Sequence, residues 1–153
     1  MPEMKLPGPD HPITISAKAG RVQVRYEGHV IGDSRQTLLL KESSYKPVLY
    51  FPREDVDMGF FARTDRVTYC PYKGEANYYT LTRDGRIAEN AVWTYENPYP
   101  AMEQIRDRLA FYPHYVQIDE IEEGADAAAI RDAILHTDDG AGSSQKEHWP
   151  PTV

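Results

Sequence analysis

The sequence predicts a mainly β protein built from antiparallel strands, and three observations support this. Short segments alternate apolar and polar residues with a period of two, as strands with one buried face do. Turn signals containing glycine separate these segments at short intervals. The pair Asp84-Gly85 stands between two such segments and is a strong signal for a two-residue hairpin turn. With 153 residues the chain can bury a real core, and we expect residues 11–118 to form a single β-rich domain.

The first elements are short strands that follow a loose arm. Residues 1–10 contain three prolines and no periodicity, so we expect them to be a flexible arm. Residues 13–16 and 22–26 then alternate apolar with polar side chains, and Gly20 and Gly28 mark turns. This part of the chain therefore predicts β-hairpins.

The sharpest predicted hairpin surrounds Asp84-Gly85. A two-residue turn there would place Tyr78 opposite Ala91 and Ala76 opposite Trp93. Because side chains alternate between the two faces of a strand, five small or aromatic residues would share one face. Small residues beside large rings leave room for a ligand pocket, unless another sheet fills that room. The five residues are Ala76, Tyr78, Ala91, Trp93 and Tyr95.

Two helices are expected after the hairpin. Pro100 suits the first position of a helix, and Met102, Ile105 and Leu109 follow at i, i+3 and i+7, so a packed helix is predicted over about residues 100–111. A C-terminal helical extension, residues 119–136, would contain a helix at about 126–136. Residues 137–153 have few apolar anchors, and we expect a flexible tail that can be removed with little loss of stability.

Composition excludes several classes of function. The net charge of −7 and the scattered basic residues argue against nucleic-acid binding. No apolar run approaches the ~20 residues needed to cross a membrane, and the N-terminus does not resemble a secretory signal, so the cytoplasm is the expected compartment. A single cysteine and widely spaced histidines predict neither a disulfide nor a metal site. Phosphate-binding loops and nucleophile elbows are absent, and no cofactor is expected.

A cysteine and a lysine, both potentially reactive, lie in a segment that also contains proline and several aromatic residues. Cys70 lies between Tyr69 and Pro71, and Lys73 follows within three residues. Cys70 could act as a nucleophile or redox thiol if the charge of Lys73 favours its thiolate. The alternative is a buried cysteine that serves as a small hydrophobic residue at the end of a strand.

The same segments predict a ligand site. Arg53 and Lys73 could orient an anionic group, although Arg53 could instead pair with neighbouring acids on the surface. Tyr78, Trp93 and Tyr95 could stack on a planar ligand, or simply belong to the core. We expect Arg53, Cys70, Lys73 and Trp93 to converge on one pocket. Because two cations repel, that pocket should also hold an acid, such as Glu54 or Glu75, or a bound anion.

Six short motifs of the sequence resemble those of a known family. The motifs are His11-Pro12-Ile13, Tyr50-Phe51-Pro52-Arg53-Glu54-Asp55-Val56, Thr68-Tyr69-Cys70-Pro71-Tyr72-Lys73-Gly74, Ala76-Asn77-Tyr78-Tyr79, Ala91-Val92-Trp93 and Ala110-Phe111-Tyr112-Pro113. Together they resemble the bacterial and fungal family called domain of unknown function 427, which also carries a nucleotidyltransferase-like name. The resemblance covers residues 11–118. It implies coiled antiparallel sheets of the β-tent type that meet over a central pocket, in a version without zinc.

The resemblance implies a fold and a candidate site but no reaction, because the family's activity is unassigned. No Gly-Ser followed by an Asp-x-Asp or Asp-x-Glu magnesium site accompanies it, as nucleotidyl transfer would need. Two hypotheses therefore follow. The first is a domain that binds a small planar or anionic molecule, and the second is an enzyme that uses Cys70 in the same pocket. A structural or interaction domain is the third, plainer possibility, and the oligomeric state is left open.

Overall fold

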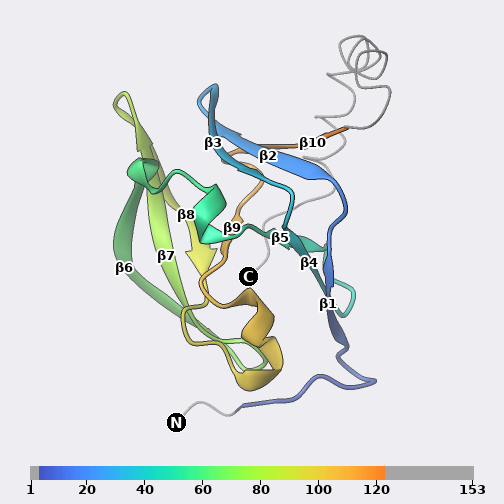
Figure 1. Ribbon diagram of the computed structural model, residues 1–153. Helices are drawn as coiled ribbons and strands as arrows, with labels where there is room; N and C mark the ends of the chain where they lie inside the picture. The colour runs from blue at the N-terminus through green and yellow to red at the C-terminus, as the bar shows by residue number, and fades with distance from the viewer. Residues whose placement is uncertain (1–3, 123–153) are drawn as a thin grey trace.

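Residues 4–122 are the part of the chain that the computed structural model describes, and they are mainly β, as predicted (Figure 1). The strands form three antiparallel sheets. The first sheet contains β1 (Ile13–Ala17), β4 (Leu38–Glu42) and β5 (Val48–Tyr50), and the second contains β10 (Gln117–Ile121), β2 (Arg21–Tyr26) and β3 (His29–Ser34). The third contains β6 (Phe61–Cys70), β7 (Gly74–Arg83), β8 (Arg86–Thr94) and β9 (Leu109–Phe111).

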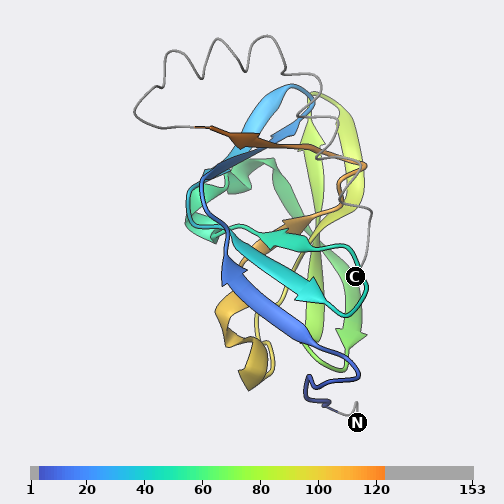
Figure 2. The same ribbon diagram turned by 90° about the vertical axis from the view of Figure 1, so that its right-hand side faces the viewer.

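The third sheet faces the other two. In Figure 1, strands β6 to β8 stand on the left, with β2, β3 and β10 at the upper right and β1 and β4 at the lower right. The view turned by 90° shows β10 and β2 above β4 and β1 (Figure 2). Short 3-10 turns connect the strands: η1 (Arg53–Asp55), η2 (Met58–Phe60) and η3 (Pro100–Ile105).

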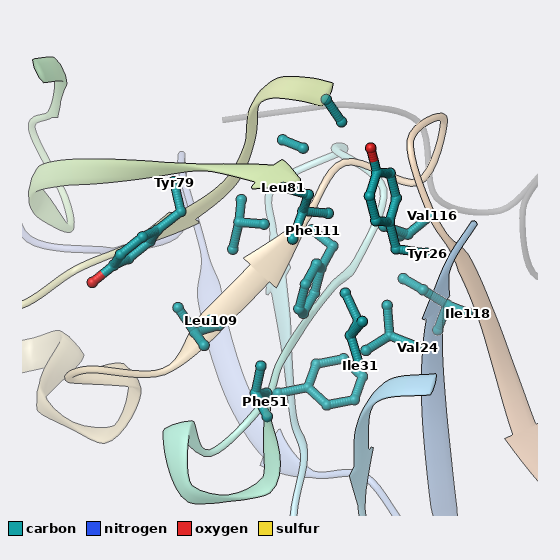
Figure 3. Close-up of a cluster of buried hydrophobic side chains, with 14 of the residues drawn as sticks. Val24, Tyr26, Ile31, Phe51, Tyr79, Leu81, Leu109, Phe111, Val116 and Ile118 are labelled. Carbon is teal, nitrogen blue, oxygen red and sulfur yellow. The ribbon is translucent and has the colours of Figure 1, made fainter. Parts of the chain in front are cut away.

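The buried side chains form two clusters. The larger one joins strands of the second and third sheets, and Figure 3 shows Phe111 near its middle and Phe51 at its lower edge. The rings of these two residues meet edge to face, with their centroids 5.5 Å apart. The second cluster joins the first and third sheets and contains Tyr50, Trp93 and Tyr95. Burial of so many aromatic side chains stabilises the arrangement of the sheets, because each ring removes a large apolar area from water.

The predicted hairpin at Asp84-Gly85 is confirmed, because Arg83 pairs with Arg86 and both turn residues have positive φ, 49° and 79°. The predicted register holds from the turn as far as Leu81 and Ala88 and is wrong beyond that pair. Tyr78 pairs with Trp93 rather than with Ala91.

A bulge on β8 causes this shift. Leu81 pairs with Ala88 and Tyr79 with Val92, so Thr80 alone stands opposite the three residues 89–91. Within the bulge, Asn90 has a φ of 53° and donates its backbone N–H to the hydroxyl of Thr80 over 3.0 Å. Asparagine tolerates this left-handed conformation better than most residues do.

The bulge also changes which residues share a cluster. Ala76, Tyr78, Trp93 and Tyr95 lie together in the second cluster, as the alternation predicts. Ala91 instead belongs to the larger cluster, so the prediction that it lies beside these rings is wrong.

The predicted helix over residues 100–111 is also wrong. The chain makes only the 3-10 turn η3, which is kinked at Met102 and ends at Ile105. Residues Leu109–Phe111 then form β9, which pairs with β8. Met102 and Ile105 are buried by the turn and Leu109 by the strand, so the helical spacing of apolar residues arises without a helix.

The bounds of the domain differ from those predicted from the sequence. Within the predicted arm, the backbone N–H of Lys5 donates to the carbonyl of Pro71 over 2.8 Å. Residues 119–121, assigned to the C-terminal extension, complete strand β10. The predicted helix at 126–136 and the tail 137–153 lie outside the described residues.

Gly74 begins β7 with a φ of 111°, a conformation that side chains with a Cβ rarely adopt, and a Cβ there would lie 3.4 Å from the carbonyl oxygen of Asn97. We expect Gly74→Ala to lower the free energy of unfolding by about 2 kcal/mol. Gly85→Ala is the matched control, because its φ is 79° and nothing lies within 4 Å, and it should cost about 1 kcal/mol. Urea denaturation measures both values, and equal losses would contradict this account of the Gly74 turn.

Candidate functional site

A cavity of about 580 Å³ lies between the first sheet and the strands β6 to β8. The end of β6 contributes Cys70 to its wall, the turn that follows contributes Lys73, β7 contributes Tyr78, and β8 contributes Trp93. Four of the six residues predicted for the site are therefore brought together. Arg53 and Tyr95 do not line this cavity.

Local chemistry explains the turn that carries two of these residues. Pro71 cannot donate a backbone hydrogen bond, so it disfavours continuation of β6 beyond Cys70. Gly74 supplies the positive φ that starts β7, and it pairs with Cys70 across the turn. Cys70 and Lys73 consequently stand at the two ends of a tight connection beside the cavity. Cys70 is half-buried and carries a free thiol.

Lys73 forms a buried ion pair. Its side chain is only 6% exposed, and its Nζ lies 2.6 Å from Oε1 of Glu42, which is 11% exposed. The other carboxylate oxygen of Glu42 lies 2.8 Å from Nε2 of His11. The His11 ring stacks in parallel on Tyr72, with centroids 4.1 Å apart. An acid does stand beside Lys73, but it is Glu42 and not Glu54 or Glu75.

This arrangement shifts the pKa values of both partners in the directions expected for an ion pair. Burial pushes the pKa of Glu42 upward, but the charge and hydrogen bond of Lys73, together with His11, outweigh it and leave that pKa below 4.5. Burial likewise lowers the pKa of Lys73, but the electrostatic interactions of Lys73 with Tyr50 and with the carboxylate of Glu42 outweigh it, so that pKa lies above 10.5. Both groups are therefore ionised at neutral pH.

Aromatic side chains with polar tips form the rest of the wall. The indole N–H of Trp93 donates to the hydroxyl of Tyr50 over 3.2 Å. The hydroxyl of Tyr78 lies 2.9 Å from that of Thr68, and the guanidinium carbon of Arg66 lies 4.9 Å from the centroid of the Tyr78 ring. This wall offers flat apolar surface and hydroxyl groups together.

Arg53 has a different place from the one predicted. Its guanidinium donates to the backbone carbonyl of Asp107, to the hydroxyl of Tyr79 and, over 3.4 Å, to the hydroxyl of Thr94. These contacts tie η1 to the segment before β9 and to the third sheet. Because the donors of Arg53 are directed at protein atoms outside the cavity, we assign it a structural role.

Tyr95 lies beside the site without lining it. The side chain is fully buried, and Nζ of Lys73 lies 5.9 Å from the centroid of its ring. Among the described residues its hydroxyl has no hydrogen-bond partner. Tyr95 therefore packs behind the wall of the site, in the same cluster as Tyr50, Tyr78 and Trp93.

Sequence reasoning missed several lining residues: His11, Glu42, Tyr50 and Arg66. His11 and Tyr50 belong to motifs of the resemblance, so a signal for them existed. Glu42 had none, because an acid at the end of an alternating strand is usually a solvated charge.

Within residues 4–122, no three His, Cys, Asp or Glu side chains are grouped so that they could hold a metal ion. In the same part of the chain, no helix has the length and apolar character needed to cross a membrane.

Three antiparallel sheets and a cavity of aromatic and charged side chains define a β domain with a candidate ligand site. A family model described as domain of unknown function DUF427 matches residues 14–124, which is most of the chain. The protein belongs to this family, and the predicted resemblance is confirmed. A comparison with curated proteins found no match.

Proposed function

We propose that this domain binds a small, planar, anionic molecule in the cavity beside Lys73. The charge of the lining carries the proposal. Lys46, Arg66 and Lys73 line the cavity with Glu42 as the opposing carboxylate, although the chain as a whole has a net charge of −7. A cavity lined by positive charges attracts anions, while the negative net charge of the rest of the protein repels them from other parts of the surface.

The charges divide into an inner and an outer set. Lys73 lies in the interior, and its charge is balanced by Glu42. Lys46 and Arg66 are exposed at the rim and line the cavity, and neither forms an ion pair with an acid among the described residues. An anionic group of a ligand would therefore be held at the rim, where two long cationic side chains can reach it.

The aromatic wall favours a flat ligand. Tyr78 and Trp93 present rings from neighbouring strands, and Tyr72 closes the turn side. A cavity of about 580 Å³ is within the range of roughly 300–1,000 Å³ that drug-sized molecules occupy. Stacking on Tyr and Trp side chains depends little on which aromatic ring the ligand contains. It therefore selects a class of ligands and not one compound.

A thermal-shift screen tests this function, with aromatic carboxylates and phosphates compared with their uncharged amides. We expect the anions to raise the melting temperature, since a ligand at a hundred times its dissociation constant stabilises by ~2.7 kcal/mol. Arg66→Glu should weaken binding of the best anion about 10-fold. Arg86→Glu is the matched control, because it makes the same charge change at an exposed residue outside the cavity. No stabilisation by any anion, or equal effects of the two variants, would contradict the proposal.

A second candidate is an enzyme in which Cys70 acts as nucleophile or redox thiol. It is favoured by the position of Cys70 in the same wall as Lys73. The rate of thiol alkylation as a function of pH decides between the two. Reaction at rates typical of a thiolate well below pH 8 would favour the enzyme, and an unreactive native thiol would exclude it.

A further inference from the structure

The inner end of the cavity has a hydrogen-bond donor without an acceptor. Tyr50 lines the cavity with only 1% of its surface exposed. Its hydroxyl accepts the N–H of Trp93 over 3.2 Å, and an indole nitrogen can only donate. The hydroxyl proton of Tyr50 therefore remains unused, since this is its only hydrogen bond among the described residues.

The neighbouring groups supply more donors than acceptors. Lys73 carries three N–H groups and directs one of them to Oε1 of Glu42. The other oxygen of Glu42 is taken by His11. Burial raises the pKa of the Tyr50 phenol above 10.0 although the charge of Lys73 opposes this, so Tyr50 is protonated and able to donate at neutral pH. Among the described residues, no acceptor is placed to receive the hydroxyl proton of Tyr50.

Charge decides which acceptor fits. Lys73 and Glu42 already neutralise each other, so a carboxylate placed beside them would be an unpaired buried charge. A carbonyl oxygen offers the same lone pairs without a charge. An anionic group of the ligand belongs instead at the exposed rim with Lys46 and Arg66.

We propose that Tyr50 donates its hydroxyl proton to a neutral carbonyl oxygen of the ligand, and thereby selects planar keto or amide compounds that carry an anionic group at the opposite end. This inference rests on the proposed function, because it concerns the same cavity. Tyr50 becomes a specificity-determining residue, while the rim supplies the affinity for anions.

The test compares 4-acetylbenzoate with 4-isopropenylbenzoate by titration calorimetry. The two probes share the ring, the carboxylate and a trigonal carbon with its methyl group, and they differ in that a methylene group replaces the carbonyl oxygen. We expect the wild-type protein to bind 4-acetylbenzoate about 5-fold more tightly, as one net hydrogen bond provides. Tyr50→Phe should remove this preference. Tyr95→Phe is the control, because it deletes a hydroxyl that does not line the cavity and has no partner among the described residues.

The possible outcomes separate this inference from the proposed function. Equal binding of both probes by the wild-type protein would overturn the role of Tyr50 and leave anion binding intact. A preference that persists in Tyr50→Phe would do the same. If neither probe binds at 10 mM, a concentration of about a hundred times a 0.1 mM dissociation constant, both proposals fall. The comparison of probes on the wild-type protein holds even if Tyr50→Phe fails to fold. With 4-acetylbenzoate labelled with ¹³C at the carbonyl, a downfield shift on binding should occur in the wild-type protein and in Tyr95→Phe only.

Discussion

Phe51→Ala is expected to lower the free energy of unfolding by about 4 kcal/mol. Phe51 is fully buried and meets the ring of Phe111 edge to face. Its backbone also exchanges two hydrogen bonds with Leu109, of 2.8 and 2.9 Å, which link the segment after β5 to β9. The substitution would open a cavity in the larger cluster, where the side chains of the second and third sheets meet. Guanidinium denaturation followed by tryptophan fluorescence measures the loss.

Ile87→Ala is the control for this prediction. Ile87 is a large apolar residue of β8, but 69% of its surface is exposed, so its removal should change stability by less than about 0.5 kcal/mol. A loss below about 2 kcal/mol for Phe51→Ala would show that the junction between the sheets is not a centre of the packing.

Glu42→Gln is expected to cost about 3 kcal/mol, because it leaves the buried ammonium of Lys73 without a counter-charge. The double variant Glu42→Gln with Lys73→Met should recover most of this loss, since it removes both charges and keeps the volume. Glu120→Gln is the control at an exposed pair with Lys18, and it should cost less than about 1 kcal/mol. A Glu42→Gln protein as stable as wild type, or a double variant less stable than the single one, would contradict the account of the buried pair.

The same pair gives the wild-type protein a defined pH dependence. The folded pKa of Glu42 lies below 4.5, so its contribution is present above that pH and is lost as pH falls through the folded value. The folded pKa of Lys73 lies above 10.5, so its contribution is present below that pH and is lost as pH rises through the folded value. Stability curves of wild type and Glu42→Gln should therefore converge as pH falls through the folded pKa of Glu42, which lies below 4.5.

Several parts of the fold could be predicted because their cause is local. Positive φ at Asp84-Gly85 follows from the residues of the turn, and the end of β6 follows from Pro71. The helix over 100–111 could not be excluded locally. Leu109 is in a strand because β8 and Phe51 offer hydrogen-bond partners to its backbone, and these partners lie far away in the sequence.

The candidate site shows the same division. The aromatic motifs around Cys70 and Trp93 predicted a pocket wall, and both residues line the cavity. Arg53 stands in the same kind of motif, but its donors are used by protein atoms on another side of the third sheet. Only the packing of the sheets distinguishes a cation that faces a cavity from one that links two strands.

The sequence by itself determined the strand-rich class, the main hairpin and the turn that presents Cys70 and Lys73, because turn chemistry and alternation act between near neighbours. The tertiary structure decided the rest. A bulge at residues 89–91 changed the register of the hairpin and moved Ala91 to the other cluster. Glu42 became the partner of Lys73 across a separation of 31 residues. Such contacts depend on how the sheets meet, and burial in the assembled domain gives the ion pair its strength.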